Sequence, residues 1–418
     1  MGLAGDEVVE IQLGKKAGEP SIVTVNCPDQ TGLGCDLCRI ILEFGLCITR
    51  GDVSTDGHWC FVVLWVVPCS PIINIQWTGL KNRLLSACPS FCIPFYLDFG
   101  SLPKTAQMYL LKLFSVDRNG LLHDVTHVLS ELELCIHRVK VSTTPDGRVM
   151  DLFFITDGME LLHTRKRQDE TRQKLSYVLG DSCISCEIEE VECFQQGFSS
   201  LPPAVAEELF SAELSNSQVS FPTPRSDSAK MKKVNVTIDN SLSPCHTLLQ
   251  IKCVDQKGLL YDILRTLKDY NIQISYGRFM SDTNGYREVD LFIQQTDAKK
   301  IVDPEKQDAL YSKLKLEMLH PLRVIVVSRG PDTELLVANS VELCGKGRPR
   351  VFYDVTSALK LLGICIFSAE IGKHSFLERQ WEVYRFLLDE RQEFPLSSRR
   401  ARNQIVDAVR RSLLGCSN

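Results

Sequence analysis

Three short stretches, each with an acid and a glycine three residues apart, could bind a small charged ligand. They are Asp29-Gln-Thr-Gly32-Leu-Gly-Cys-Asp36, Asp117-Arg-Asn-Gly120-Leu-Leu-His-Asp124 and Asp255-Gln-Lys-Gly258-Leu-Leu-Tyr-Asp262. The glycine lets a ligand approach the backbone closely. The amides that follow it open a predicted helix, whose free N–H groups and dipole favour a carboxylate. The leading acid is placed either to accept hydrogen bonds from an ammonium group or to cap the helix.

These octets supply the candidate binding residues. They are Asp29, Gln30, Gly32 and Leu33 in the first copy, Asp117, Asn119, Gly120 and Leu121 in the second, and Asp255, Lys257, Gly258 and Leu259 in the third. A fourth copy, Gly347-Arg-Pro-Arg350-Val-Phe-Tyr-Asp354, has lost the acid and the glycine, and its proline lacks an N–H group. Its apolar column is intact, so we expect the fourth copy to fold and to bind no ligand of its own.

Few residue patterns in the chain indicate catalysis. His123-x-x-x-His127 puts two imidazoles on one helical face, but it lacks the glutamate of a metalloprotease and has no evident third ligand. We expect both histidines to flank a core helix. No nucleophile elbow or phosphate-binding loop is present. The sequence therefore predicts a protein that is not an enzyme and that has no catalytic residues.

The cysteines also fit a structural role better than metal binding. The chain has 17 of them, and an odd count argues against a complete disulfide framework. Cys35-x-x-Cys38 and Cys183-x-x-Cys186 resemble half zinc sites, but no second ligand pair stands at suitable spacing. We expect free structural thiols in a reducing compartment, with no metal and no cofactor.

The octets recur within longer repeats that predict the elements around them. Each octet follows an alternating strand and opens an amphipathic helix, which ends near Gly45, Asn271 or Gly363 in three of the copies. A second strand then turns at Asp146-Gly147 or its equivalent into a third. With a further helix and strand, each unit reads strand, helix, strand, strand, helix, strand. This order predicts an α+β fold of tandem ferredoxin-like βαββαβ domains, with antiparallel sheets and helices on one face.

The repeats predict a domain layout. We expect an N-terminal tail at 1–20, repeats at 21–104 and 105–195, a Ser/Pro-rich linker at 196–233, and repeats at 234–329 and 330–418, the last degenerate. The linker is expected to join two pairs of neighbouring repeats, with the fourth packed on the third.

Charge and hydropathy argue against nucleic acids and membranes as partners. The net charge of −5 gives no reason to expect polyanion binding, and the arginines between residues 399 and 411 are expected on a solvated helix face. The longest apolar run, 61–67, is far shorter than the roughly 20 residues of a membrane helix. We expect a soluble cytoplasmic protein, with a nuclear location left open, and neither membrane nor nucleic acid as a partner.

The repeated residues resemble a known family. Asp-x-x-Gly-Leu at the first strand–helix turn, followed by a Leu/Ile-x-Ile strand, is similar to the ACT domain. The runs Asp151-Leu-Phe and Asp290-Leu-Phe, each followed by Thr-Asp, add to this similarity in the second and third repeats. The whole chain resembles the plant ACT-domain repeat proteins, and its units are similar to those at the C-terminus of bacterial uridylyltransferases that sense glutamine.

This resemblance implies a regulatory role. ACT domains bind free amino acids where two domains meet, so the octet of one repeat should face strand residues of another. The chain would then act as an amino-acid sensor, of nitrogen status or glutamine among the options. The alternative is a ligand-free scaffold that regulates a metabolic enzyme. The partner would be a regulated enzyme or a signalling protein, and a homodimer stays open.

Overall fold

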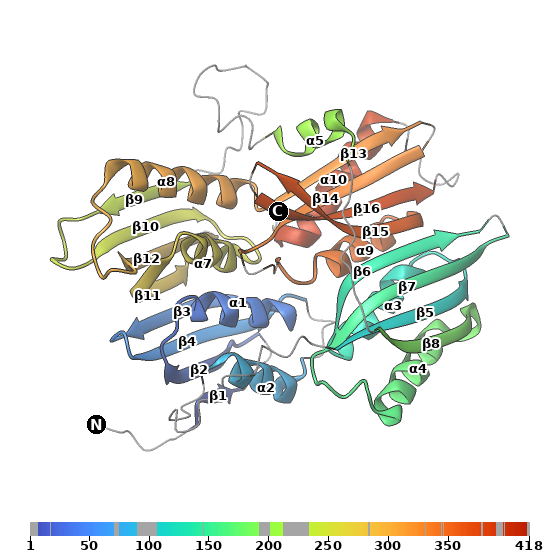
Figure 1. Ribbon diagram of the computed structural model, residues 1–418, viewed down its shortest axis with the longest axis horizontal. Helices are drawn as coiled ribbons and strands as arrows, with labels where there is room; N and C mark the ends of the chain where they lie inside the picture. Colours follow the sequence, from blue (N-terminus) through green and yellow to red (C-terminus); the bar gives the residue numbers. More distant parts are fainter. Residues whose placement is uncertain are drawn as a thin grey trace. The chain divides into compact units, whose positions relative to one another are not determined.

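The computed structural model describes residues 7–16, 18–70, 75–89, 107–144, 146–191, 201–211, 234–282, 285–330, 332–343, 345, 347–377, 379–389, 396 and 398–415. The chain forms two compact units (Figure 1): unit 1 contains Met1–Pro94 with Ala212–Pro321, and unit 2 contains Phe95–Ser211 with Leu322–Asn418. Unit 1 thus joins the first and third repeats, and unit 2 joins the second and fourth. The expectation that neighbouring repeats pair, with the fourth packed on the third, is wrong.

Unit 1 is built on an eight-stranded antiparallel sheet in the order β1-β2-β4-β3-β11-β12-β10-β9. Its strands are β1 (Val9–Gln12), β2 (Ser21–Pro28), β3 (Leu46–Thr55), β4 (Trp59–Pro68), β9 (Asn235–Asp239), β10 (Thr247–Val254), β11 (Ile272–Ser281) and β12 (Tyr286–Gln295). At the centre, β3 of the first repeat pairs with β11 of the third, from Ser54 with Tyr276 to Arg50 with Met280. Each repeat thereby covers the open strand edge of the other.

Unit 2 repeats this plan in the strand order β13-β14-β16-β15-β6-β7-β5-β8. Its strands are β5 (Met108–Val116), β6 (Leu134–Thr143), β7 (Arg148–Asp157), β8 (Cys183–Val191), β13 (Leu322–Arg329), β14 (Asp332–Ser340), β15 (Cys365–Phe376) and β16 (Arg379–Asp389). Here β15 of the fourth repeat pairs with β6 of the second through Ser368, Ala369 and Glu370.

Amphipathic helices supply the rest of each core. They are α1 (Leu33–Glu43), α2 (Trp77–Ala87), α7 (Leu259–Asp269) and α8 (Pro304–Leu319) in unit 1, and α3 (Leu121–Glu131), α4 (Arg165–Leu179), α9 (Val351–Leu361) and α10 (Arg399–Leu414) in unit 2. The expected stripe of α1 is buried, including Leu33, Leu37 and Ile41. In each unit the first helices of the two repeats pack together, α1 with α7 and α3 with α9. One hydrophobic cluster therefore spans both repeats of a unit.

The α+β, tandem ferredoxin-like class is confirmed, but the position of the edge strand in the chain differs between repeats. Only the second repeat has the expected order in the described residues, because its last strand β8 returns to pair with β5. In the other three, the edge strand comes first: β1, β9 and β13 pair with β2, β10 and β14. The strand β13, expected to end the third repeat, thus completes the sheet of the fourth. The last strand in the order expected for the first repeat would fall near residues 91–96, which lie outside the described residues.

Part of the expected linker is folded. Residues Pro203–Leu209 form helix α5, and Phe210 after it stacks on Phe376 with the ring centroids 4.6 Å apart. Ala206, Leu209 and Phe210 pack with Trp381 and Val383 of β16. The helix therefore covers a face of the fourth repeat's sheet. Residues 196–200 and 212–233 lie outside the described residues. In the part of the chain that the structure describes, no helix combines the length and apolar character needed to cross a bilayer.

Candidate ligand-binding clefts between paired repeats

The octet turns have the backbone conformation that a close approach requires. Gly32, Gly120 and Gly258 precede α1, α3 and α7 with left-handed φ values of 86°, 75° and 76°. Such φ values suit glycine because it has no Cβ. Arg350 adopts the same conformation before α9, with φ 63°. The fourth copy thus keeps the turn geometry and carries the backbone strain of a side chain there.

The first octet lines a cavity of about 70 Å³ where the first and third repeats meet, which we call the unit-1 cleft. Asp29, Gln30, Gly32 and Leu33 contribute from the octet side. The opposite wall is the beginning of β11, residues 272–274, together with the end of α7. A hydrogen bond of 3.4 Å from Gln273 to the Thr31 hydroxyl also joins the two sides. The octet of one repeat therefore faces a strand of another, as the resemblance implied.

The second octet lines the corresponding cavity in unit 2, of about 20 Å³, which we call the unit-2 cleft. Asp117, Gly120 and Leu121 lie on the octet side, and residues 364–366 of the fourth repeat, at the beginning of β15, lie opposite. Asn119 does not line this cavity, although its side-chain amide lies beside Gly363. The strand residues opposite each octet belong to the Leu/Ile-x-Ile run, which the sequence pattern predicted as the strand after the first helix of a repeat.

In both clefts a lysine from the partner repeat covers the turn glycine, Gly32 or Gly120, and this feature was not predicted. A Cβ added at Gly32 would lie 2.6 Å from Lys268, and one at Gly120 would lie 2.7 Å from Lys360. Each ammonium bonds the last Asp of the octet: Lys268 Nζ lies 3.0 Å from Asp36 Oδ1, and Lys360 Nζ lies 2.6 Å from Asp124 Oδ1. Both lysines occur six residues after the last Asp of their own octet. The cleft thus pairs a helix N-terminus with a cation, which suits a ligand carboxylate.

Arg118 adds a second cation in unit 2. Its Nη2 lies 2.7 Å from Asp124 Oδ2. Burial alone would raise the pKa of Asp124, but the hydrogen bonds and charges of Lys360 and Arg118 outweigh it and hold the pKa below its usual value. Asp124 is therefore a stable carboxylate that anchors both cations beside the turn.

The leading acids of the first and third octets, Asp29 and Asp255, bind the hairpin strands rather than the helix amides. Asp29 accepts a hydrogen bond of 2.7 Å from the Thr55 hydroxyl. Asp255 accepts from Ser281 and from Arg287. The amide after the glycine is also engaged in the turn, since Leu33 N–H donates to the Gln30 carbonyl at 3.0 Å. Of the two alternatives for these acids, the contacts of Asp29 and Asp255 are not those of a helix cap.

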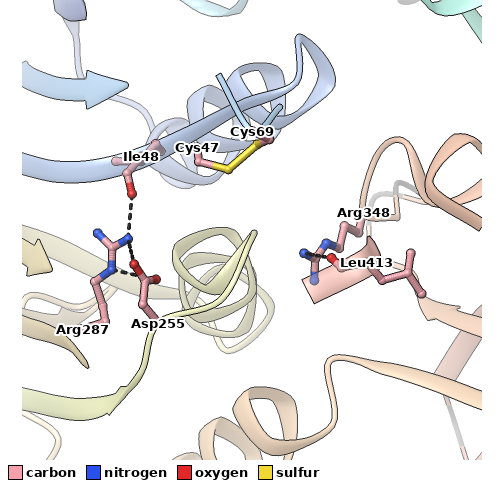
Figure 2. The surroundings of a disulfide bond; sticks show 7 residues. All are labelled: Cys47, Ile48, Cys69, Asp255, Arg287, Arg348 and Leu413. Carbon is pink, nitrogen blue, oxygen red and sulfur yellow. Dashed lines mark hydrogen bonds and ion pairs between the residues drawn. A yellow bond between two sulfur atoms is a disulfide. The ribbon is translucent and has the colours of Figure 1, made fainter. Parts of the chain in front are cut away.

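The third octet is closed by an arginine of its own repeat (Figure 2). Arg287 on β12 donates to both carboxylate oxygens of Asp255, at 3.1 Å and 2.7 Å. The same guanidinium donates to the backbone carbonyl of Ile48 on β3 of the first repeat at 2.7 Å. It also donates to the carbonyl of Thr49 on that strand at 2.9 Å. Arg287 thus occupies both oxygens of the octet acid Asp255 and ties it to β3 of the first repeat.

The sequence contains a signal for this closure. Arg287 pairs with Cys253, two residues before Asp255. The equivalent partners in the first and second repeats are Cys60 opposite Cys27 and Val149 opposite Ser115. Cys60 and Val149 each line a cleft. Neither cleft is lined by Asp255, Lys257, Gly258 or Leu259, so the structure does not bring the third set of candidates to these cavities.

A disulfide lies in unit 1 beside the contact between Arg287 and β3 (Figure 2). Cys47 at the beginning of β3 is bonded to Cys69, with the Cα atoms 5.4 Å apart. The expectation that Cys47 is a free thiol is wrong. The reason is the end of β4: Cys69 N–H bonds the Gly45 carbonyl and so brings the two side chains together.

The fourth octet is filled by its own side chains. Arg350 donates to the Ser130 hydroxyl of the second repeat at 2.8 Å and lies over the Tyr353 ring, 4.3 Å from its centroid. Arg348 is buried and donates to the Leu413 carbonyl at 2.9 Å (Figure 2). Its backbone is clamped on both sides by the Asn339 side chain. These contacts hold the turn against α10 and the second repeat.

The Asp-Leu-Phe runs of the second and third repeats face opposite ways, although they align in sequence. Asp151 pairs with Leu113 of β5 and is fully buried. Asp290 pairs with Gln250 of β10, lies half-buried and accepts a hydrogen bond of 2.9 Å from that side chain. Counted from the octet acid, the second run begins one residue later than the first. In a strand, one residue reverses the face.

Asp151 is therefore an ionisable side chain buried inside unit 2, and the similarity of the two runs in sequence did not reveal this difference. It lines the unit-2 cleft. Burial, and to a smaller extent the charge of Asp117, raises the pKa of Asp151 to about 8. Neither of its carboxylate oxygens has a hydrogen-bond partner among the described residues.

The two histidines lie where α3 meets α9. Their rings stack with centroids 6.2 Å apart, and His123 lies 5.0 Å from the Tyr353 ring. Burial, aided by the charge of Lys360, lowers the pKa of His123 to about 4. His123 is neutral at physiological pH, so it is no cation for the cleft that it lines. In the described part of the chain, no group of three potential metal ligands comes together.

The fold and the clefts define a class: paired ferredoxin-like domains with Asp-x-x-Gly turns at their interface, which is the arrangement of ACT domains. Family models agree. One described as "ACT domain-containing protein ACR10, N-terminal" matches residues 11–89, "ACR9-like, ACT-like domain" matches 235–332, and "ACT domain-containing protein ACR9, C-terminal" matches 333–415. The third-domain match includes β13, although that strand pairs with the fourth repeat.

Curated relatives cover the whole chain. ACT domain-containing protein ACR9 of Arabidopsis thaliana is 61% identical over 420 residues, covering 99% of this chain and 100% of the relative. ACT domain-containing protein ACR10 of the same plant is 51% identical over 422 residues, again covering 99% and 100%. The chain therefore belongs to the plant ACT-domain repeat family. A bifunctional uridylyltransferase/uridylyl-removing enzyme from Gluconobacter oxydans (strain 621H) is 25% identical over 200 residues, 46% of this chain and 18% of that enzyme.

Proposed function

We propose that the protein is a non-catalytic regulator that binds free amino acids in two clefts, one in each unit. The observation that carries the proposal is the unit-1 cleft, where an Asp-x-x-Gly turn faces the beginning of β11 across the repeat interface. The ligand carboxylate would lie against the N-terminus of α1 and near Lys268, while the ligand ammonium would bind Asp29. These groups are complementary to the two charges that every free amino acid carries.

The proposal includes a stoichiometry of two amino acids per chain. The third octet is occupied by Arg287, and the fourth by Arg350 and its contacts. The third and fourth repeats therefore contribute walls and lysines to the clefts of the first and second. Each unit pairs one repeat that binds with one that supports.

The expected output is a change in how the two repeats of a unit pack. A ligand between an octet and a strand of the partner repeat contacts both, so it favours the arrangement in which both are in place. A regulated enzyme or signalling protein could read that change. We propose nitrogen status as the signal, with glutamine as the first amino acid to test.

The alternative is a ligand-free scaffold. The observation that favours it is the third octet, which keeps its acid and its left-handed glycine and yet is closed by Arg287. An intact octet is therefore not sufficient for binding. If both open clefts were also silent, the repeats would serve only to present surfaces to a protein partner.

A thermal-shift screen of the full chain against the twenty amino acids distinguishes the amino-acid-binding regulator from the ligand-free scaffold. A ligand at about 100 times its dissociation constant stabilises the fold by about 2.7 kcal/mol, which raises the melting temperature measurably. Gly32→Val and Gly120→Val should each remove part of the shift, because the added side chain enters a left-handed turn beneath a lysine. The absence of a shift with all twenty amino acids, for a folded protein, would favour the scaffold.

A further inference from the structure

One carboxyl group in unit 2 has no structural explanation. Asp151 is fully buried, lines the unit-2 cleft and has no hydrogen-bond partner for either oxygen among the described residues. Buried polar groups are almost always paired, because leaving one unpaired costs free energy. Such a group beside a cavity is expected where a ligand supplies the partner.

The fold itself does not require an acid at this position. Asp151 pairs with Leu113 four residues before the octet acid. The same position is Val62 opposite Val25 in the first repeat, and Val289 opposite Ile251 in the third. Both valines are buried in the core. A β-branched apolar residue therefore satisfies this site in the strand, and the acid is particular to the second repeat.

We propose that Asp151 is a ligand-binding residue, and that the unit-2 cleft takes the ammonium group of an amino acid between the carboxylates of Asp117 and Asp151. This inference rests on the proposed function and deepens it. Two carboxylates lining one cleft favour a group that carries a positive charge and several N–H donors, and an ammonium has both. The small volume of the cleft, about 20 Å³, suits this compact group. The unit-1 cleft holds its ligand ammonium with Asp29 and has no equivalent of the second acid.

The charges around Asp151 make this binding dependent on pH. The octet turn contributes Asp117 and Arg118, α3 contributes His123 and Asp124, and α9 contributes Lys360. The strands at the cleft add only uncharged side chains there, including Val141, Val149 and the Cys365 thiol. Both cations are held by Asp124, at 2.7 Å and 2.6 Å, and His123 is neutral. Among the residues that the structure describes, no cation is therefore hydrogen-bonded to Asp151.

In the empty cleft Asp151 holds a proton at neutral pH. Burial, and then the charge of Asp117, raises the pKa of its carboxyl to about 8. A bound ammonium stabilises the carboxylate, so the carboxylic acid gives its proton to solvent and the ligand nitrogen keeps its own charge. One proton leaves for each amino acid bound. Affinity should rise with pH until the empty cleft is itself deprotonated, above about pH 8.

The test is calorimetric titration of the full chain with glutamine, and then with each of the other nineteen amino acids. The Gly32→Val background confines binding to unit 2. Between about pH 6.5 and about pH 7.5 the dissociation constant should fall roughly eightfold, and buffers of different ionisation enthalpy should report close to one proton released. The N-acetyl derivative of the same amino acid, which has no ammonium, should not bind.

Variants of Asp151 supply the control. Asp151→Val introduces the residue found in the first and third repeats, and Asp151→Asn keeps the shape without the charge. Both should bind more weakly and lose the pH dependence and the proton release. If an amino acid binds unit 2 with the same affinity in wild type and Asp151→Asn, without proton release, the inference is overturned and the proposed function stands. If no amino acid binds either cleft of the wild-type protein, both fail.

Discussion

The two clefts have the same backbone surroundings and differ in the side chains that line them. Each has a left-handed glycine, a lysine from the partner repeat and the beginning of a partner strand. Beyond these shared features, the unit-1 cleft is lined by Cys60, Phe279 and Leu291, whereas the unit-2 cleft is lined by Val149 and Asp151. The backbone geometry of the turn is thus shared by the two units, whereas the side chains on the strands behind the turn differ between them.

A second contrast lies within unit 1. The first octet opens on a cavity, and the third, with the same acid and glycine, is closed by Arg287. The difference is one side chain on the strand after the hairpin. The octet therefore supplies the turn for a cavity, and a side chain on the neighbouring strand determines whether that cavity is open or filled.

The largest expected effect is the loss of one cleft at a time. Gly120→Val should abolish binding in unit 2 and leave unit 1 unchanged, and Gly32→Val should do the reverse, because each added side chain would meet a lysine and strain a turn. Titration should report one amino acid per chain for each variant instead of two. Circular dichroism should show both variants folded. Two bound amino acids in either variant would break the comparison.

The matched control is Gly258→Val in the third repeat. Gly258 has the same left-handed φ, 76°, but its octet is closed by Arg287. This variant should lower stability through backbone strain and leave the number of bound amino acids unchanged. A loss of ligand here would show that the third octet also binds.

Next in size is the removal of Arg287. Arg287→Ala should destabilise unit 1 by about 3 kcal/mol, at the lower end of the cost of breaking a buried ion pair, because Asp255 is partly exposed. Denaturant titration of the full chain measures this change. The control is Arg278→Ala, whose ion pair with Asp52 across the same β3–β11 junction is exposed and should matter little. Equal effects of the two variants would contradict the role assigned to Arg287.

The buried acid of unit 2 gives an effect of opposite sign. Asp151→Val should stabilise the ligand-free protein by about 1–3 kcal/mol, because it removes an unpaired buried group. The pKa of Asp151 is about 8 in the folded protein and has an ordinary value of 3.8. The wild type is thus most stable relative to the variant below about pH 4 and loses that stability as pH rises through about 8. Denaturation near pH 5 and near pH 8 should show the advantage of the variant growing.

The smallest effect is expected at the fourth octet. Arg350→Gly relieves a left-handed turn but loses the contacts with Ser130 and Tyr353, so stability should change by less than about 1 kcal/mol. The number of bound amino acids should remain two by titration. A third binding event would show that Arg350 alone had closed a functional site.

What the sequence determined is mostly local. It predicted the octet turns, the stripe of α1 and the helix ends at Gly45, Asn271 and Gly363, which have φ values of 73°, 54° and 71°. These features depend on residues close in the chain, through the sterics of φ and the period of a helix. The ferredoxin-like class follows from the order of such elements. Gln30, Leu33 and Leu121 line the clefts for the same reason, because they belong to these local turns, and their role in ligand binding stays a prediction.

Only the tertiary structure showed which repeats pair and which side chains face each octet. The pairing of first with third and second with fourth repeats depends on the complementarity of strand edges far apart in sequence, and four similar repeats do not state which edges match. In the sequence, Lys268 and Lys360 are lysines in the last turn of a helix, as many helices have. Only the packing of the partner repeat brings a glycine into contact with each of them. The face of Asp151 was hidden by one residue of register, since a strand turns its whole pattern over with a single step.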